Sequence, residues 1–301
     1  MVNQTTVHSI GKKTLDYELC TTCRHGACSM CYLKSFKRAG KALQKNTDTI
    51  VKELNLFNDQ GYSTFLITSD ILEHEDFIKI IKAARKQHVL TTGITIDRNP
   101  EILDELKDNG ITMIYLSANL EKESRILQLP PYELVRRVAG LTREKGLDVM
   151  LTMIITSTNY NKVEDMAELA QATGANNLRF LPYIPYNNPQ LSPSSQQLKE
   201  FLESSYKFQK SGKYRKDELY FSREIAHPSH KKSPFCNCGG ERFVLGADNL
   251  IYPCLPFIAP EFVIGKFDNG KLEFNKDYSS PSLSQLCRGY EHYMKQWGRL
   301  A

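Results

Sequence analysis

Val149-Met-Leu-Thr-Met-Ile-Ile155 is an almost uninterrupted apolar run rich in residues that favour β-structure, which is typical of a buried strand. An amphipathic helical pattern over 163–173 and a second strand pattern over 177–181 follow it. A strand, a helix and a strand in this order predict a βαβ unit, in which the two strands lie parallel in one sheet.

The same alternation extends back to the N-terminus. Further strands are expected at 17–19, 64–68, 89–92 and 111–116, and further helices at 48–58, 77–84, 100–109 and 131–145. Six such units between about residues 14 and 185 predict an α/β fold with an open or partial barrel. In such sheets the chemistry collects at the C-terminal ends of the strands, so the loops after the strands are the candidate site.

The remainder of the chain has another pattern. Turn signals and a helix over 197–209 predict a helical connector over 187–232. Its part from 207 to 232 holds eight Lys or Arg and three Asp or Glu, which favours a solvated connector over an anion-binding surface. Short runs at 242–245, 250–252 and 262–267 predict hairpins, and a helix is expected at 282–297. The expected domains are 1–186, 187–232 and 233–301.

Composition narrows the class of protein. With 301 residues, 41% of them hydrophobic and 24% charged, the chain can close a sizeable core. It contains no run of eighteen apolar residues and no secretory signal pattern at its start, which predicts a cytoplasmic protein without a membrane span. A net charge of +5 is too small for a typical nucleic-acid binder, although it suits an anionic partner.

Eight cysteines are gathered near the two ends of the chain, with none between 31 and 236. Four of them lie in Cys20-Thr-Thr-Cys23-Arg-His-Gly-Ala-Cys28-Ser-Met-Cys31, directly after the first expected strand. Clustered reduced thiols indicate a metal or iron–sulfur site rather than a disulfide scaffold. Three thiolates would leave one iron of a four-iron cluster open. All four together could form a closed zinc site, and thiols that merely pack are the third interpretation.

The Cys23-x4-Cys28-x2-Cys31 motif after the first strand resembles the radical S-adenosylmethionine (radical SAM) superfamily, although that family usually has three residues between its first two cysteines. The resemblance implies a partial (β/α)6 TIM-type barrel in which Cys23, Cys28 and Cys31 bind a [4Fe–4S] cluster that holds SAM. Met30 and Tyr32 occupy the positions where the family commonly has residues lining the cofactor.

Further landmarks of the family follow in the expected order. Thr68, Ser69 and Asp70 stand where the family binds the amino group of SAM, and their other interpretation is a helix N-cap before Glu73. Thr91-Thr92-Gly93 resembles the turn after the third strand. Ser117 ends the fourth strand, where a small polar residue approaches the ribose or methionine, and 178–185 resembles the segment that lines the adenine.

The C-terminal cysteines resemble the auxiliary-cluster extension called SPASM or twitch. Cys238-x10-Asn249-x4-Cys254 fits its pattern with Asn in place of Gly, and Cys287 is a later ligand. The resemblance implies a small β-hairpin plus helix extension that binds a second [4Fe–4S] cluster, with zinc as the alternative. Cys236 is either a fourth ligand or a catalytic thiol that returns a hydrogen atom to the substrate.

The activity implied is reductive cleavage of SAM to a 5′-deoxyadenosyl radical that abstracts a substrate hydrogen. The expected outcome is epimerisation, oxidation or cross-linking of a ribosomally made peptide. The alternatives are the same chemistry on a sugar, aminocyclitol or nucleoside, and a non-catalytic zinc or iron–sulfur scaffold. An electron donor such as flavodoxin or ferredoxin is implied. The positive net charge favours an acidic peptide or a phosphorylated compound as substrate.

Overall fold

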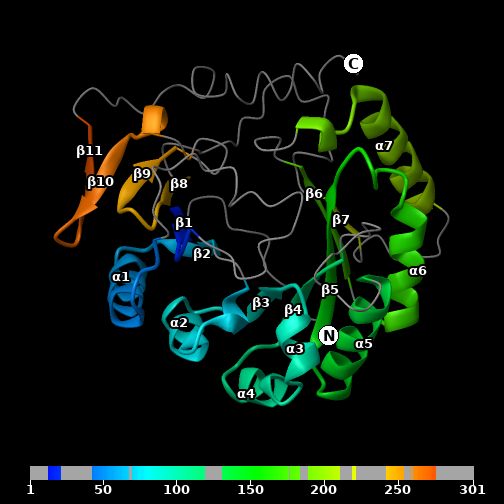
Figure 1. Cartoon of the computed structure of the whole chain (residues 1–301), viewed down its shortest axis with the longest axis horizontal. Helices are drawn as coiled ribbons and strands as arrows, with labels where there is room; N and C mark the ends of the chain where they lie inside the picture. Colours follow the sequence, from blue (N-terminus) through cyan, green and yellow to red (C-terminus); the bar gives the residue numbers. More distant parts are fainter. Residues whose placement is uncertain are drawn as a thin grey trace.

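Parallel strands arranged in an open arc, with helices on the outer side, form the framework of the protein (Figure 1). The computed structural model describes residues 13–21, 43–67, 70–118, 131–175, 177–183, 189–210, 219–221, 242–253, 258 and 260–275. The mixed α/β architecture agrees with the predicted partial barrel, and the strands form two separate sheets rather than a closed one.

All six strands expected before residue 185 are present, with ends that differ from the prediction by a few residues at most. They are β1 (Thr14–Glu18), β2 (Ser63–Ile67), β3 (His88–Thr91), β4 (Met113–Ser117), β5 (Asp148–Ile155) and β6 (Asn177–Pro182). β1 pairs in parallel with β2, and β3 to β6 pair in parallel in sequence order. In the described chain β2 and β3 are not hydrogen-bonded neighbours, so a seam lies between them.

Two further features of the sheets were not predicted from the sequence. β7 (Leu219–Phe221) lies within the segment expected to be a helical connector and pairs in parallel with β6. β8 (Arg242–Leu245) pairs in parallel with β1, although more than two hundred residues separate them. The sheet that contains β1 then continues with β9 (Leu250–Tyr252), β10 (Gly265–Asp268) and β11 (Lys271–Phe274). Each of these strands pairs antiparallel with the strand before it. The domain boundary at residues 232 and 233 stays a prediction.

Side chains fasten both ends of β8 to β1. The guanidinium of Arg242 donates two hydrogen bonds to the Asp16 carboxylate, at 3.0 and 3.1 Å. At the other end, the backbone N–H of Ala247 donates to Oε2 of the buried Glu18 at 2.8 Å. Burial raises the pKa of Asp16, and the charge of Arg242 opposes that rise in pKa. The C-terminal strands are therefore held on β1 by side chains as well as by the backbone.

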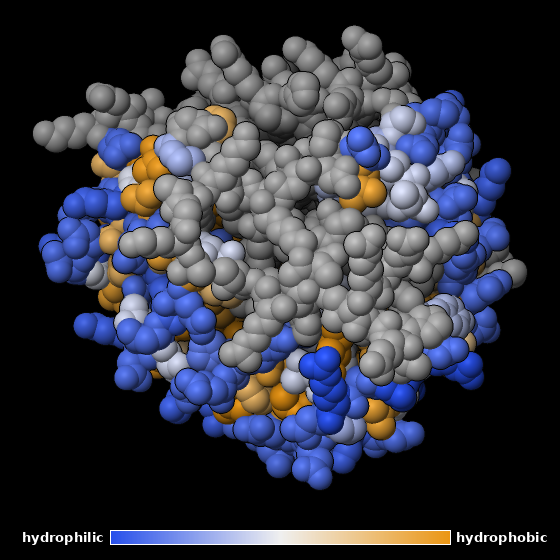
Figure 2. All heavy atoms as spheres, viewed as in Figure 1, coloured by the Kyte–Doolittle hydropathy of each residue, from blue (hydrophilic) through white to orange (hydrophobic). Residues whose placement is uncertain are grey.

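The helices pack on one face of the sheets. They are α1 (Thr47–Asp59), α2 (Phe77–Ala83), α3 (Ile94–Arg98), α4 (Ile102–Asp108), α5 (Pro131–Glu144), α6 (Val163–Thr173) and α7 (Ser195–Lys210), with short 3-10 helices η2 (Ile71–Glu73), η3 (Pro189–Leu191) and η5 (Pro260–Phe262). No described helix is both long and apolar enough to cross a membrane. The outer surface of the described part is mostly hydrophilic in the view of Figure 2.

The helix expected to open at Pro100 begins two residues later, and α3 precedes it. A residue before proline is disfavoured in the helical conformation. Asn99 accordingly has φ −140° and ψ 81° and ends α3. Pro100 thus follows the end of α3 and lies in the turn that leads into α4, since its carbonyl accepts the N–H of Leu103 at 3.1 Å.

Each parallel strand has a helix-facing side and a concave side. In β4, Ile114 and Leu116 are buried in the main hydrophobic core, whereas Met113, Tyr115 and Ser117 are only partly buried. Because side chains alternate along a strand, Tyr115 and Ser117 point away from the helices. The concave side of the arc is therefore the accessible wall that leads to the strand ends.

Candidate active site

The cysteine-rich segment begins and ends at a short stem beyond the C-terminal end of β1. The backbone N–H of Thr21 donates to the carbonyl of Leu43 at 2.9 Å, and the N–H of Leu43 donates to Oγ1 of Thr21 at 2.8 Å. Residues 19–21 and 43–45 are thereby held side by side. Cys20 lies within this stem and is buried.

Cys23, Cys28 and Cys31, together with Met30 and Tyr32, belong to the intervening segment 22–42, which lies outside the described residues. The stem itself establishes that this segment starts and ends at the C-terminal end of β1. That is the end at which the sequence predicted the chemistry to collect.

A buried ion pair anchors the second half of the stem. The ammonium of Lys45 lies 2.7 Å from Oε2 of Glu53 on α1, and the two side chains are only 5% and 9% exposed. The Tyr17 hydroxyl on β1 donates to the same Glu53 oxygen at 2.5 Å, and the Lys45 ammonium lies 4.9 Å from the centre of the Tyr17 ring. Three elements, the stem, β1 and α1, are thus joined through one carboxylate.

Desolvation dominates the electrostatics of this group. Burial lowers the pKa of Lys45, and the hydrogen bond and charge of Glu53 oppose that lowering, with weaker help from Asp248 and Glu18. Burial and the negative charge of Glu53 both raise the pKa of the Tyr17 hydroxyl, so this hydroxyl stays protonated and donates. The ion pair therefore compensates a desolvation cost and needs both of its partners.

The loops after β2 and β3 meet at Asp70. Oδ2 of this buried carboxylate accepts hydrogen bonds from Oγ1 of Thr91 at 2.6 Å, from the N–H of Thr92 at 3.0 Å and from Oγ1 of Thr92 at 2.9 Å. Oδ1 accepts from the N–H of Leu72 at 3.2 Å, so Asp70 is the N-cap of η2. The N-cap interpretation of this residue is confirmed. Thr68 and Ser69 lie outside the described residues.

Asp70 also closes the seam between the two sheets. The seam has no backbone ladder, and the Asp70 hydrogen bonds to Thr91 and Thr92 cross it at the C-terminal end. At the other end Lys86 donates to the carbonyl of Thr64. Two landmarks that are separate in the sequence, Asp70 and the turn of Thr91 to Gly93, are thus one structural unit.

Gly93 is required in that turn. Its φ is +86°, which strains any residue with a side chain. A Cβ atom at this position would also lie 2.7 Å from Cδ1 of Leu116 on β4. The turn after β3 therefore holds its shape through a glycine and through the Asp70 hydrogen bonds.

The family of this chain is settled by a match to the model of the Radical SAM superfamily over residues 17–170, which is just over half of the 301 residues. The protein belongs to the radical SAM superfamily. Membership implies a [4Fe–4S] cluster and SAM as cofactors, and three thiols between the two halves of the stem fit a cluster with one open iron. No curated protein sequence matches the chain.

Several solved structures share the fold. SuiB from Streptococcus suis bound to S-adenosylmethionine aligns with a TM-score of 0.63 and 14% identity, over 81% of this chain and 60% of SuiB. SuiB bound to the precursor peptide SuiA aligns with a TM-score of 0.66 and 12% identity, over 88% and 65%. The protein anSMEcpe with bound AdoMet and the Cp18Cys peptide aligns with a TM-score of 0.60 and 16% identity, over 84% and 77%. The chain thus spans about three fifths of SuiB.

Within this radical SAM fold, Ser117 is the last residue of β4 and is partly buried on the concave side. It lies opposite Thr152 of β5, and the carbonyl of Thr152 accepts the N–H of Ala118 at 2.8 Å. The structure therefore places Ser117 at the strand end where the sequence expected it. Its contact with a cofactor stays a prediction.

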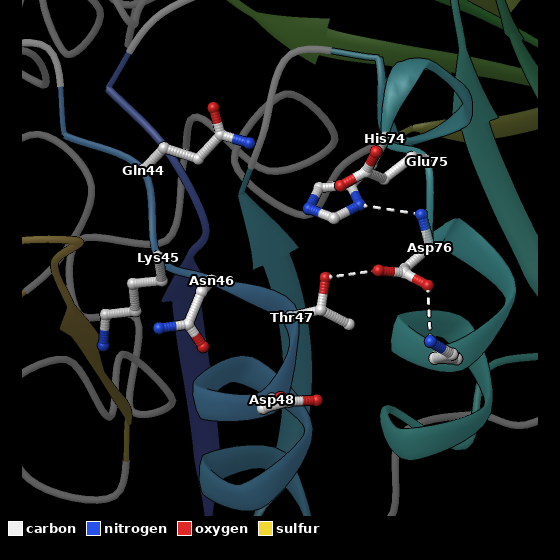
Figure 3. A pocket seen from close by; sticks show the side chains of 9 residues that line it. Gln44, Lys45, Asn46, Thr47, Asp48, His74, Glu75 and Asp76 are labelled. Atoms are coloured by element: carbon white, nitrogen blue, oxygen red, sulfur yellow. Dashed lines mark hydrogen bonds and ion pairs between the residues drawn. The ribbon is translucent and has the colours of Figure 1, made fainter.

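A shallow polar pocket lies beside the stem (Figure 3). Gln44 lies on one side of it, and His74 and Asp76 lie on the other. The Asp76 carboxylate accepts from Oγ1 of Thr47 at 2.8 Å and pairs with Lys79 at 2.6 Å. Thr47, Asp76 and Lys79 are thus joined by a hydrogen bond and an ion pair within this pocket.

Cys236, Cys238, Cys254 and Cys287 lie outside the described residues, as does the expected terminal helix over 282–297. Conversely, sequence reasoning missed Lys45 and Glu53. Charged residues are usually expected to be exposed to solvent. Only the burial of Lys45 and Glu53 as a pair identifies them as an anchor of the stem.

Asp70→Asn tests whether the seam depends on a carboxylate. An amide has one oxygen where the carboxylate offers two, so it cannot accept all four hydrogen bonds. We expect the free energy of unfolding to fall by about 2 kcal/mol, as for a buried donor left unpaired. Urea denaturation of the protein without SAM measures this, with Asp108→Asn, at an exposed position of the outer helix α4, as the control. An unchanged stability would show that the seam is held by other contacts.

Proposed function

We propose that this radical SAM enzyme modifies a ribosomally made peptide by epimerisation, oxidation or cross-linking. The observation that carries the proposal is the likeness of fold to SuiB bound to its precursor peptide and to anSMEcpe bound to a peptide, on a chain with the cysteine motif of the family. Sugars, aminocyclitols and nucleosides are the alternative substrates. The experiment described below distinguishes them from a peptide.

Cys23, Cys28 and Cys31 would hold the [4Fe–4S] cluster, next to the stem that Lys45 and Glu53 anchor. When bound, the cluster and SAM together supply a 5′-deoxyadenosyl radical that removes a hydrogen atom from the substrate. The buried ion pair would keep the thiolates at the end of β1. A cluster held in a fixed place lets the concave wall orient the substrate and exclude water.

Asp70, with Thr68 and Ser69, would bind the amino group of SAM. Oδ2 of Asp70 already accepts three hydrogen bonds, whereas Oδ1 accepts one, from Leu72. A carboxylate oxygen has two lone pairs, so Oδ1 retains the capacity to accept from an ammonium. Ser117 would approach the ribose or methionine from β4, and Met30 and Tyr32 would line the cofactor.

A second [4Fe–4S] cluster would be held by Cys238, Cys254 and Cys287. The support is the register of the hairpin, in which Val244 is the partner of Tyr252, so the start of β8 and the end of β9 lie together. Cys238 precedes β8 by four residues and Cys254 follows β9 by two. The described strand ends from which the chain continues toward these two thiols therefore lie at the same end of the hairpin. Iron and zinc analysis of the purified protein separates a cluster from a zinc site.

Cys236→Ala distinguishes the two roles proposed for this thiol. If Cys236 returns a hydrogen atom to the substrate, deoxyadenosine is still formed but the epimerised product is lost. The thiol hydrogen goes to the substrate radical, and an external donor of the flavodoxin or ferredoxin class reduces the sulfur radical that remains. If the variant instead binds less iron, Cys236 is a ligand. Deoxyadenosine, product and iron are measured on the same sample.

The substrate class is tested with the oxygen-free, cluster-loaded enzyme, SAM, a reductant and short peptides encoded beside its gene. Mass spectrometry would detect the loss of two hydrogen atoms for an oxidation or a cross-link, and uptake of solvent deuterium for an epimerisation. Modification of a peptide supports the proposal. Turnover of a sugar, aminocyclitol or nucleoside with no change in any peptide would contradict it.

A further inference from the structure

The concave face of the sheet formed by β3 to β7 carries a row of polar side chains. Ser117, Thr152 and Arg179 are register partners on β4, β5 and β6 and so project from the same face. The residues that alternate with them, such as Leu151 and Phe180, are buried in the helix-facing core. Thr152 and Arg179 therefore face the inside of the arc.

Part of the inner wall is exposed to solvent. Leu90 of β3 lies opposite Tyr115 on this face and is 46% exposed despite being apolar. Tyr115 stacks on His88 with ring centres 4.5 Å apart and an angle of 10° between the planes. The guanidinium carbon of Arg179 lies 6.0 Å from the centre of the Tyr115 ring. The guanidinium of Arg179 therefore lies near the ring of Tyr115, which is itself stacked on His88, on the partly exposed inner wall.

Arg179 carries a positive charge that no described carboxylate pairs with. Its side chain is partly buried, so its charge is only partly hydrated. A guanidinium has five N–H donors and no acceptor, and a carboxylate fits two of these donors at once. The chemistry of this position suits an anionic oxygen pair.

Thr152 gives independent support. Thr152 is only 4% exposed, and its Oγ1 has no hydrogen-bond partner among the described residues. A buried hydroxyl without a partner costs about 1–3 kcal/mol, and such groups are uncommon in native structures. A hydroxyl next to a guanidinium on the same wall becomes satisfied when a carboxylate binds between them.

From these observations we propose that Arg179 and Thr152 bind a carboxylate of an acidic peptide substrate on the inner wall of the barrel. This rests on the peptide-modifying function proposed above. Ser117, the member of this row that is assigned to SAM, lies on β4, whereas Arg179 lies on β6 with β5 between them. We therefore assign the carboxylate at Arg179 to the substrate, and the test below separates it from the carboxylate of SAM.

The test uses two probes that carry the same dye, penta-glutamate and penta-glutamine, with binding followed by fluorescence anisotropy. The cluster-loaded wild type should bind penta-glutamate about tenfold more tightly, the value of one charge-assisted hydrogen bond. Arg179→Met should remove most of this preference and Arg179→Lys should keep part of it. Arg136→Met, which removes an exposed charge on the outer helix α5, should leave the preference unchanged.

Thr152→Val supplies a second readout that a purely structural role would not produce. The variant should be at least as stable as the wild type in urea, because the lost hydroxyl has no described partner, yet it should bind penta-glutamate about threefold more weakly. A wild type without preference for penta-glutamate, or an equal loss in Arg136→Met, would overturn the proposal. So would a higher Kd for SAM in Arg179→Met with the peptide preference intact, since that assigns the guanidinium to SAM. The mass spectrometry of peptides described above tests the proposed function separately, because it detects modification whether or not the peptide is acidic.

Discussion

Cys28→Ser is expected to abolish cleavage of SAM, with deoxyadenosine reduced by at least about a thousandfold relative to the wild type. The serine oxygen is a poor ligand for an iron–sulfur cluster, so the variant should lose the cluster on which radical formation depends. Because Cys28 lies between the two halves of a stem held by its own hydrogen bonds, the fold should persist. Deoxyadenosine is measured by chromatography after anaerobic reduction, and folding by circular dichroism.

Cys20→Ala is the matched control. Cys20 is part of the stem and is buried, and it is the thiol nearest to the triad in sequence. We expect this variant to keep its iron and its SAM cleavage. Loss of iron in Cys20→Ala together with full activity in Cys28→Ser would mean that the triad is wrongly assigned.

Glu53→Ala is expected to lower the free energy of unfolding by about 3–5 kcal/mol, the cost of leaving a buried charge without its partner. The substitution strands the Lys45 ammonium and removes the acceptor of the Tyr17 hydroxyl. Loosening of the stem should also reduce the iron that the protein retains after gel filtration. Urea denaturation and iron analysis measure the two effects.

Two comparisons separate this anchor from an ordinary ion pair. Asp104→Ala removes an exposed partner of Lys145 and should cost less than about 1 kcal/mol. Adding Lys45→Met to Glu53→Ala should restore part of the stability, because the stranded charge is removed. If Glu53→Ala costs no more than Asp104→Ala, the buried pair does not anchor the stem.

Local patterns predicted most of the secondary structure. The apolar run over Val149–Ile155 and the periodicity over Val163–Thr173 indicate β5 and α6, because a buried strand and an amphipathic helix need those spacings. The predicted start of α4 differs by two residues because proline has two meanings for a helix. Proline suits the first turn of a helix and also ends the preceding one, and Pro100 both follows the end of α3 and lies in the turn that leads into α4.

Long-range pairing could not be predicted. Nothing local in Arg242–Leu245 indicates that this strand joins β1, because the pairing depends on partners more than two hundred residues away, such as Asp16. The same limit applies to the site. The cysteine motif was readable because its spacing is local, whereas the Lys45–Glu53 pair and the Thr152–Arg179 row exist only once the strands and helices are packed.

The most direct test is the formation of deoxyadenosine by the oxygen-free, reconstituted wild-type protein with SAM and dithionite. Three thiolates at the end of β1 that hold a four-iron cluster should cleave SAM only when the reductant is present. A protein that carries the cluster but yields no deoxyadenosine, or that binds zinc in its place, would contradict this assignment.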